Sequence, residues 1–409
     1  MVQDDNYRAE ESEEVNEFRY VNEGPKQNPD DFAPVSGRHS GRSSHSHRRR
    51  RYRSRRRTAL IVCLSLVLVG ILVIAGCGFL EATGKRSLYE NRVGEASPTL
   101  AEAPTAVAEK EEEYEYVLPE TTKWDDRWIR YHGKVYQYNE DILTLFLMGI
   151  DTDKKVAPAA DAISGGQADG LYLMVMNPHT AKLSLIAINR NTMVDMDILD
   201  TDGSVITNMP AQICLVHGYG DGMELSCEKQ TKAVSDLLYN LPIHAYASLN
   251  MGAVPTLNDA VGGVTVRRMT YENGEIIYGD EETLYGKDAY RYIRSRGSDF
   301  GSANYRLEKQ KEYLNAFISK LGQKLKQNPS SITEIYNAIS PYMVTDIDLT
   351  EALYLATQVS SYDTKPAVFG LDGETVMGDN GYEEFYPDDI ELYDLIIKVF
   401  YEEVDLGGN

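Results

Sequence analysis

Hydrophobic and polar positions divide this chain of 409 residues into a polar leader, one long apolar run, and a remainder in which short apolar segments alternate with polar ones. The apolar run extends from Ala59 to Leu80 without a charged residue. At a rise of about 1.5 Å per residue it is long enough to cross a hydrocarbon core of about 30 Å. It predicts one transmembrane helix over residues 58–80.

Charges on either side of this run predict its orientation. Arg48 to Arg57 is rich in arginine and precedes the span, whereas Glu81 follows it. Because cytoplasmic flanks carry the excess of Lys and Arg, residues 1–57 are expected to form a disordered cytoplasmic tail, with the bulk of the chain outside the cell membrane. Ile74 to Cys77 also resembles a lipobox in which Cys77 would be lipidated, but the leader is long for a signal peptide.

Two further segments follow the span. Residues 81–125 are rich in Ala, Pro, Thr and Glu and lack the apolar periodicity of a core, which predicts an extracellular stalk. Residues 126–409 have the pattern of one folded extracellular domain, with strands near 142–151, 245–251 and 264–269 and a hairpin around Asn177-Pro178. Helices are expected at 227–241, at 254–263 and from about Asn304. This alternation predicts an α/β domain whose central sheet is covered by helices.

The long helix that begins near Asn304 has an apolar stripe at helical spacing, formed by Leu307, Leu314, Ile318, Leu321 and Leu325. The last apolar segment, residues 392–401, is expected to close the same domain.

Net charge limits the partners of this domain. The whole chain has a formal net charge of −22, and the residues after 57 hold 28 basic and 53 acidic side chains. Such an acidic surface repels nucleic acid, so no nucleic-acid partner is expected. One short segment, Tyr292 to Lys311, is nevertheless rich in cations, which points to a specific anionic group.

Four cysteines are present, and two of them, Cys63 and Cys77, fall within the apolar span. Cys214 and Cys227 belong to the exported part, where an oxidising exterior predicts a disulfide between them. Two buried thiols are the alternative, because the sequence does not show the separation of their Cα atoms.

Several common catalytic motifs are missing, including the G-x-S-x-G elbow, H-E-x-x-H, C-x-x-C and the G-x-x-x-x-G-K-[ST] phosphate loop. What remains is a pair of carboxylates at strand ends, Asp151 and Asp169, with the arginines Arg190, Arg294, Arg296 and Arg306. Carboxylates suit a hard cation such as Mg²⁺, and guanidinium forks bind phosphate oxygens in pairs. The combination suits a phosphate ester bound with Mg²⁺.

Ordered motifs extend this interpretation. "FLMGID", "ADGLYLMVMNPHTAKLSLIAINRNTM", "HGYGDG", "LNDAVGGVTV", "YIRSR" and "RLEKQ" follow one another between about Leu143 and Leu321. Together they resemble the LytR-CpsA-Psr family of bacterial cell-wall enzymes. The resemblance implies an α-β-α sandwich with a central mixed sheet. It also implies a phosphotransferase of Gram-positive bacteria that moves a glycopolymer from a polyprenyl pyrophosphate carrier to peptidoglycan, with Mg²⁺ or Mn²⁺ and an apolar pocket for the lipid.

The resemblance assigns roles one position at a time. Asp151 and Asp169 match the family's metal-binding aspartates, and Asp169 is counted with the catalytic residues Arg190, Arg294 and Arg296. Pyrophosphate binding is expected of Arg190, Arg294, Arg296, Arg306, Lys309 and Gln310. Because a loop carboxylate can be removed without opening a cavity, replacing Asp151 or Asp169 is expected to weaken turnover and leave the fold intact.

The chain departs from the family pattern at several positions. Asn189 and Asn191 replace a proline and an aspartate, and Gln167-Ala168 replaces a typical Arg-Ser. Lys309 stands where arginine is expected, which keeps the charge and loses the planar fork. The general base for the attacking hydroxyl is left open between Asp169 and Asp299.

Two other functions stay open on the sequence. One is a polyprenyl-pyrophosphate phosphatase that uses the same site with water as the acceptor. The other is a non-catalytic membrane-tethered regulator or glycan-binding module, which the 28 tyrosines could serve by stacking on sugars.

Overall fold

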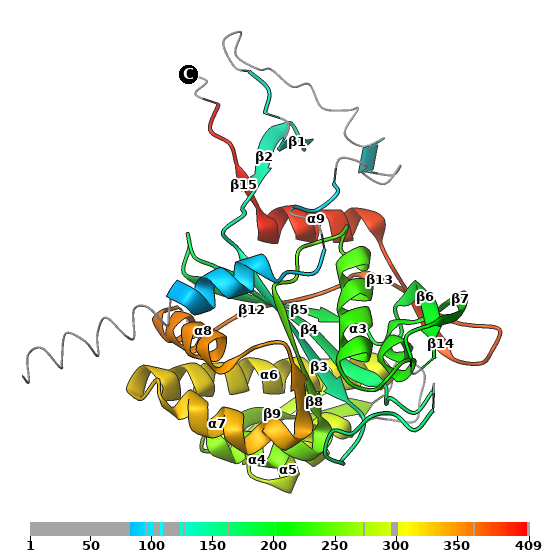
Figure 1. Cartoon of the computed structure of the whole chain (residues 1–409), viewed down its shortest axis with the longest axis vertical. Helices are drawn as coiled ribbons and strands as arrows, with labels where there is room; N and C mark the ends of the chain where they lie inside the picture. The colour runs from blue at the N-terminus through cyan, green and yellow to red at the C-terminus, as the bar shows by residue number, and fades with distance from the viewer. Residues whose placement is uncertain are drawn as a thin grey trace, which may run out of the picture. The chain divides into compact units, whose positions relative to one another are not determined.

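The computed structural model describes residues 82–94, 97–100, 107–108, 123–125, 127–161, 163–200, 202–272, 275–295, 302–362 and 365–406 (Figure 1). The predicted cytoplasmic tail, the transmembrane helix over residues 58–80 and the lipobox cysteine Cys77 lie outside these ranges. Within them, none of the helices combines the length and the apolar character that crossing a bilayer requires.

A mixed sheet of six strands forms the centre of the domain, in the order β11-β8-β3-β4-β5-β12. Its strands are β3 (Leu143–Ile150), β4 (Ala168–Asn177), β5 (Lys182–Ile188), β8 (Ala245–Asn250), β11 (Met343–Thr345) and β12 (Ala367–Gly370). Strands β3, β5, β8 and β12 run in one direction, while β4 and β11 run in the other. The predicted hairpin around Asn177-Pro178 is the β4–β5 pair.

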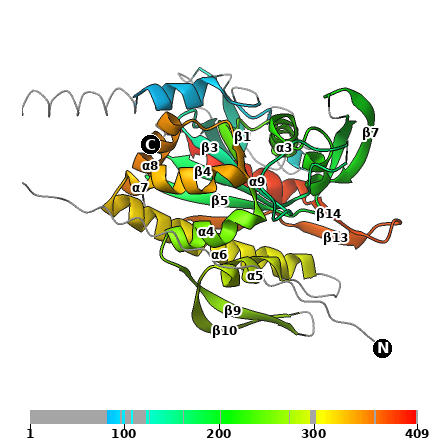
Figure 2. The ribbon, with the colours of Figure 1, turned by 60° about the horizontal axis from the view of Figure 1, so that its bottom comes forward.

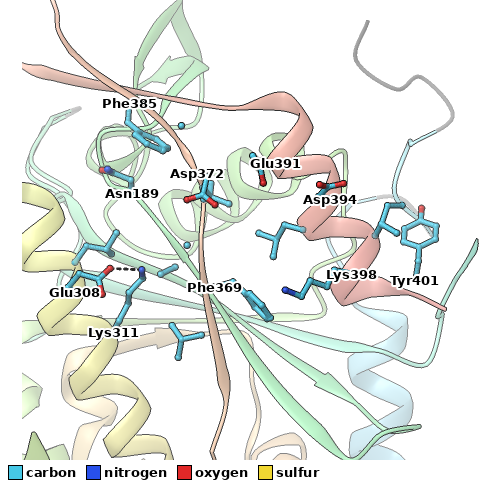
Figure 3. A pocket seen from close by; sticks show the side chains of 18 of the residues that line it. Asn189, Glu308, Lys311, Phe369, Asp372, Phe385, Glu391, Asp394, Lys398 and Tyr401 are labelled. Atoms are coloured by element: carbon cyan, nitrogen blue, oxygen red, sulfur yellow. Dashed lines mark hydrogen bonds and ion pairs between the residues drawn. The ribbon is translucent and has the colours of Figure 1, made fainter. Parts of the chain in front are cut away.

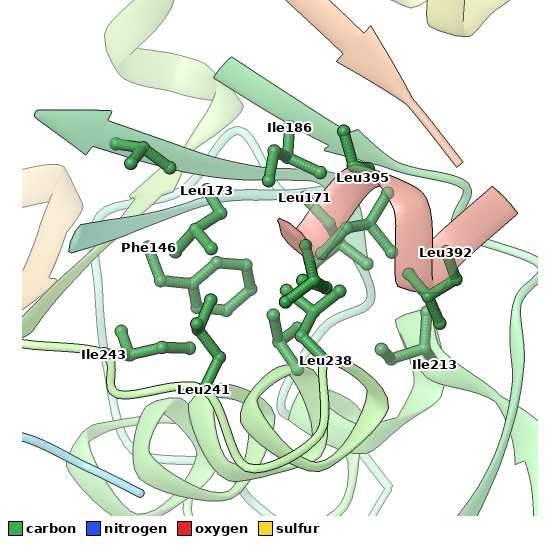
Figure 4. Packing of buried hydrophobic residues seen from close by; sticks show 14 of the residues in the cluster. Phe146, Leu171, Leu173, Ile186, Ile213, Leu238, Leu241, Ile243, Leu392 and Leu395 are labelled. Atoms are coloured by element: carbon green, nitrogen blue, oxygen red, sulfur yellow. The ribbon is translucent and has the colours of Figure 1, made fainter. Parts of the chain in front are cut away.

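Side chains alternate between the two faces of this sheet, as the period of a strand requires. In β4, Leu171, Leu173 and Val175 enter one hydrophobic core, and Tyr172 and Met176 enter the other. Helices α3 (Glu224–Leu237) and α9 (Asp389–Phe400) cover the first face (Figure 4). The second face is covered by α4 (Val254–Ala260), α5 (Lys287–Arg294), α6 (Ser302–Gln327) and α8 (Leu349–Ser361), with α7 (Ser331–Ile339) beside them (Figure 2). The three-layer α/β prediction is confirmed.

Helix α6 carries the apolar stripe that the sequence predicts. Leu307, Leu314, Ile318, Leu321 and Leu325 all pack into the second core. Burying one large apolar side chain contributes about 1.5–3 kcal/mol, so this stripe fixes α6 firmly against the sheet. The first turns of α6, which hold Arg306 and Lys309, are therefore held in place by packing farther along the same helix.

Smaller sheets surround the central one. β1 (Trp128–Tyr131), β2 (Lys134–Tyr138) and β15 (Tyr401–Glu403) form one of them, so the C-terminal segment closes the domain as predicted. Three hairpins are β6 (Met193–Leu199) with β7 (Val205–Gln212), β9 (Val264–Glu272) with β10 (Glu275–Leu284), and β13 (Gly373–Met377) with β14 (Glu383–Pro387). Short 3-10 helices are η1 (Ile213–Gly218), η2 (Met251–Ala253) and η3 (Ser340–Tyr342).

The predicted stalk needs a correction. Residues 82–90 form a helix, and Leu88, Leu100 and Val107 are almost fully buried in the two cores. Val93 also forms a β-bridge with Ile243. These described parts of residues 81–125 belong to the domain. Their apolar residues are single and far apart in sequence, so they leave no periodic signal.

Candidate active site

Charged side chains gather at the edge of the sheet where β3 and β5 end and β4 begins. Asp151 directly follows β3, Asp169 is the second residue of β4, and Arg190 lies two residues after β5. Because β3 and β5 are parallel and β4 runs between them in the opposite direction, the topology brings these three residues to one edge. Ligands of open α/β sheets bind beyond the carboxyl ends of the strands, which is the edge in question.

Asp169, Arg190 and Arg306 form a group with little access to water, which we term the inner cluster. Nη1 of Arg306 donates a hydrogen bond of 3.1 Å to Oδ2 of Asp169, and the Arg190 guanidinium forms an ion pair with Oδ1 of the same carboxylate. The side chains of Asp169 and Arg306 are 7% and 8% exposed, and that of Arg190 is 18% exposed. Two arginines thus share one carboxylate away from water. The group as a whole carries one excess positive charge.

Arg190 makes two further contacts. Its Nη2 donates to Oε1 of Gln167 at 2.7 Å and lies 3.1 Å from Sγ of Cys214. Burial acts to lower the pKa of this guanidinium. Cys214, Asp169 and Asp151 together outweigh this effect and raise the pKa above its ordinary value. Arg190 is therefore a permanent cation held in a fixed orientation.

A second group, which we term the outer cluster, consists of Asp151, Asp153, Tyr290 and Arg294. Nη2 of Arg294 lies 2.8 Å from Oδ1 of Asp151, and its Nη1 contacts both Asp153 and the Tyr290 hydroxyl. The Tyr290 hydroxyl donates a hydrogen bond of 2.7 Å to Asp153. The Arg294 hydrogen bond to Tyr290 is the largest cause of the raised pKa of this guanidinium, and Asp151 adds to it.

The outer cluster is accessible to solvent. The side chains of Arg294, Asp151 and Asp153 are 43%, 38% and 61% exposed. Arg294 is the last residue of α5. The predicted partner Arg296 and the candidate base Asp299 lie outside the described residues.

Lys309 and Gln310 lie in the first turns of α6 and are both buried. Nζ of Lys309 donates to Oγ of Ser295 and lies 4.5 Å from the centre of the Tyr292 ring. Burial lowers the pKa of the Lys309 ammonium, and the Glu282 carboxylate opposes this effect. A cation held by one hydroxyl and an aromatic face keeps donors for an incoming anion.

The side chain of Gln310 forms two hydrogen bonds within the domain. Its Oε1 accepts a hydrogen bond of 3.0 Å from Tyr172, and its Nε2 donates to the carbonyl oxygen of Ile293 at 3.3 Å. The side chain thus joins β4, α6 and the end of α5. It positions the segments that carry Arg294 and Arg306.

The two asparagines that replace family residues form hydrogen bonds outside the two clusters. Nδ2 of Asn191 donates to Oε2 of Glu383 at 3.2 Å, at the start of β14, and the Asn191 carbonyl accepts from the Phe385 amide. Oδ1 of Asn189 accepts from the backbone amide of Asn191. Asn191, which replaces the family aspartate, therefore contacts the β13–β14 hairpin.

Sequence reasoning missed Gln167, Asp153 and Tyr290 as members of the site. Tyr290 precedes Arg294 by four residues on a helix, a spacing that places two side chains together and could have identified the contact. Asp153 lies two residues after Asp151 in an irregular segment, and Gln167 precedes β4. Asp153 had no usable sequence signal, whereas Gln167 was noted only as a replacement for an arginine of the family pattern.

The predicted disulfide between Cys214 and Cys227 is wrong in this structure, where both cysteines are free and buried. Cys214 lies in η1 beside Arg190, whereas Sγ of Cys227, in α3, lies 3.6 Å from Nε2 of His217. Burial raises the pKa of the Cys227 thiol to about 12. Each thiol has its own partner, and a sequence separation does not specify the Cα distance and Cβ directions that a disulfide needs.

Asp151 and Asp169 fit a metal only in part. Across the described residues, His, Cys, Asp and Glu side chains form no group of three that could hold an ion by themselves. Mg²⁺, however, is commonly bound by one or two carboxylates that are completed by water and substrate phosphates. Oδ1 of the buried Asp169 has an ion pair but no hydrogen-bond partner, which is compatible with a cation that arrives with its substrate.

A cavity of about 960 Å³ lies between α6, β12 and α9 (Figure 3). Asn189, which precedes Arg190, and Leu307, which follows Arg306, both line it. The rest of the lining is largely aromatic and charged. Such a lining does not suit a polyprenyl chain, so this cavity is not the apolar lipid pocket that the family resemblance implies.

Comparisons with known proteins agree with the family resemblance and with the fold. The chain matches the LytR_cpsA_psr family over residues 105–387. It is 27% identical over 246 residues to the polyisoprenyl-teichoic acid–peptidoglycan teichoic acid transferase TagU of Oceanobacillus iheyensis, covering 58% of this chain and 70% of that protein. A protein of the same name from Enterococcus faecalis is 27% identical over 244 residues, covering 59% of this chain and 73% of that protein.

Among solved structures, protein gbs0355 of Streptococcus agalactiae superposes with a TM-score of 0.52 at 21% identity, covering 63% of this chain and 86% of that one. This likeness concerns the fold alone. The family match covers more than half of the chain, and its curated relatives TagU are transferases by name. The chain therefore belongs to the LytR-CpsA-Psr family of transferases.

Proposed function

We propose that this protein is a membrane-anchored extracellular phosphotransferase that attaches a glycopolymer from a polyprenyl pyrophosphate carrier to peptidoglycan. The observation that carries the proposal is the inner cluster, in which the buried Arg306 and the partly buried Arg190 share one carboxylate at the carboxyl edge of the sheet. Such a cluster costs desolvation energy and stabilises the fold only weakly, which favours a role in binding an anion.

Pyrophosphate suits the cations that surround this edge. Arg190, Arg294, Arg306 and Lys309 outnumber the acids Asp151, Asp153 and Asp169 by one. Guanidinium forks match the spacing of phosphate oxygens, and the half-exposed Arg294 can rotate from Asp151 toward a ligand. The inner cluster is preorganised, so its charges need little rearrangement when the anion binds.

The reaction is an exchange of bonds at one phosphorus atom. The oxygen of an acceptor sugar hydroxyl forms a bond to the phosphorus that carries the glycopolymer, and the bond from this phosphorus to the bridging oxygen breaks. Polyprenyl phosphate leaves with the electron pair of that bond. Arg190, Arg294 and Arg306 orient the phosphates and neutralise the charge on the leaving group, which supplies most of the rate.

The proton of the acceptor hydroxyl passes to a base, for which the candidates are Asp169 and Asp299. Both oxygens of Asp169 face arginines in the inner cluster. This favours a positioning role for Asp169 and leaves Asp299 as the alternative. Asp151 and Asp169 would hold Mg²⁺ or Mn²⁺, which would supply further neutralisation of phosphate charge when bound.

The membrane topology forms part of the proposal, with the N-terminus in the cytoplasm and the domain outside. Its support is the arginine-rich segment that precedes the apolar run of residues 59–80. Protease added to intact cells should remove the domain and leave an N-terminal tag intact. Protection of the domain under the same conditions would reverse the orientation.

The decisive experiment supplies the full chain in detergent with a polyprenyl-pyrophosphoryl oligosaccharide, Mg²⁺ and a peptidoglycan fragment. Mass spectrometry should detect an oligosaccharide joined through a phosphodiester to the fragment. Free phosphorylated sugar would favour the phosphatase instead. Donor that is bound but unchanged would favour the regulator or glycan-binding module.

A further inference from the structure

We propose that the cavity between α6, β12 and α9 binds an uncharged glycan, and that this glycan is the sugar chain of the acceptor. The identification of this glycan as the acceptor rests on the proposed function. The evidence for a glycan site comes from the cavity itself. We term it the edge cavity, because β12 is the edge strand of the central sheet. Helix α9, which forms one wall, follows the residues matched by the family.

The chemistry of the edge cavity suits sugar hydroxyls. Figure 3 shows the carboxylates of Asp372, Glu391 and Asp394 around one part of the cavity, with the Asn189 amide opposite them. Among the described residues, Asp372 and Glu391 have no side-chain hydrogen bond or ion pair. Carboxylates accept hydrogen bonds from several hydroxyl groups, and an amide both donates and accepts.

Aromatic rings supply the second element of a sugar site. Phe369, Phe385 and Tyr401 line the cavity with the polar groups, and rings of this kind offer apolar faces to the C–H faces of sugars. A pocket with apolar walls and a few polar groups is typical of a small-molecule site. The mixture distinguishes the edge cavity from a simple acidic patch.

One buried hydroxyl independently points to a missing partner. Tyr131 lines the edge cavity and is only 5% exposed, and its Oη has no hydrogen-bond partner within the described part of the chain. A buried hydroxyl without a partner costs free energy. A ligand or its bound water could satisfy this group after a small side-chain movement.

Charge selects the acceptor over the donor. Lys311 is paired with Glu308 at 2.6 Å, and Lys398 lies 4.9 Å from the centre of the Phe369 ring. These two lysines face four carboxylates in the lining, so the cavity is net negative. It repels a polyanionic glycopolymer and accepts a neutral sugar chain.

The position of the edge cavity is also right for an acceptor. β5 and β12 are parallel, with Ala187 opposite Gly370, so Asn189 and Asp372 follow the two strands at the same sheet edge. Arg190 is the residue after Asn189. A glycan in the edge cavity therefore lies beside the inner cluster, where the phosphate of the donor is expected.

The test measures binding of a neutral β-linked N-acetylglucosamine tetramer to the full chain in detergent by calorimetry. The tetramer should bind the wild type, and the Asp372→Asn, Glu391→Gln double variant should raise Kd at least tenfold. Asp379→Asn, an exposed aspartate outside the cavity lining, is the matched control and should change nothing. Poly(glycerol phosphate) at equal concentration should not displace the tetramer.

The absence of tetramer binding to the wild type would overturn the inference, and so would equal binding by the double variant. Displacement by poly(glycerol phosphate) would also overturn it, because the cavity would then belong to the donor. Binding of farnesyl pyrophosphate is measured separately and should be unchanged in the double variant. If the wild type does not bind farnesyl pyrophosphate, that result counts against the proposed function alone.

Discussion

The inner and outer clusters contain the same kinds of side chain in two different environments. In the inner cluster, Arg190 and Arg306 share the carboxylate of Asp169, and the three side chains are between 7% and 18% exposed. In the outer cluster, Arg294 pairs with Asp151, and both side chains are about two-fifths exposed. The type of ion pair is the same, and only the access of water differs.

This difference predicts different consequences for stability and for binding. Removing one partner of a buried pair leaves a charge without compensation, whereas water and salt screen an exposed pair. The inner cluster should therefore tolerate little change without loss of folding. The outer cluster should act mainly on the ligand, since Arg294 can leave Asp151 at small cost.

The largest expected effect is that of Asp169→Asn. The amide keeps the size of the side chain but removes the carboxylate charge that Arg190 and Arg306 share, which should lower the free energy of unfolding by about 3–5 kcal/mol. This revises the expectation from sequence that the fold would survive loss of Asp169 unharmed. Urea unfolding measures the effect, and Asp151→Asn is the control, with a loss of at most about 1 kcal/mol. Equal losses in the two variants would abolish the distinction between the clusters.

Replacement of Arg294 should affect transfer much more than stability. Arg294→Ala should lower the transfer rate about 100-fold, because one preorganised cation at the pyrophosphate is lost. Arg294→Lys should lose less, since a point charge replaces the fork. The unfolding free energy should change by at most about 1 kcal/mol.

Arg291→Ala provides the matched control for Arg294. Arg291 lies on the same helix and forms an exposed pair with Asp288. Its loss should leave the transfer rate unchanged. If the Arg294→Ala protein also transfers at the wild-type rate, the outer cluster has no part in binding pyrophosphate. Arg296→Ala is expected to behave as Arg294→Ala does.

A smaller effect is expected from Lys309 and from pH. Because burial lowers the pKa of Lys309, the unfolded chain holds more protons than the folded one between that lowered pKa and about 10.5. The contribution of Lys309 to the free energy of unfolding should therefore rise with pH across this window. Lys309→Met should remove this pH-dependent contribution. Urea unfolding at several pH values below 10 measures the difference between the two proteins. A difference that stays constant with pH would show that Lys309 is not desolvated.

The smallest effect, close to zero, is expected from a reducing agent. Because Cys214 and Cys227 are free and have separate partners, dithiothreitol should leave the melting temperature unchanged. Mass spectrometry of non-reduced peptides should find both thiols alkylated after unfolding. A linked Cys214–Cys227 peptide, with a melting temperature that falls on reduction, would restore the disulfide prediction.

The sequence predicted the framework of the fold better than the contacts of the site. β3, the β4–β5 hairpin and α6 have strong periodic patterns, and the structure has them at the expected places. The β6–β7 hairpin was missed because most of its β7 residues are exposed and carry no core pattern. Patterns report burial, so an element that buries little is hard to find.

For the site, sequence order identified which residues gather at the sheet edge but not which residues pair. Asp151, Asp169, Arg190 and Arg306 do meet there. The burial of Lys309 and the bridging role of Gln310 depend on how α6 packs against α5 and β4. Such tertiary contacts have no local signature in the sequence. The contact between the Cys214 thiol and Arg190 is a further tertiary contact of this kind.

The single helix that carries Arg306 and Lys309 also carries the apolar stripe that ends at Leu325 in the second core. Part of the anion site and a large part of the hydrophobic core therefore belong to one cooperative unit. Amide hydrogens of α6 from Arg306 to Gln310 should consequently exchange with solvent only when that whole unit opens. On heating, loss of anion binding should coincide with global melting and should not precede it.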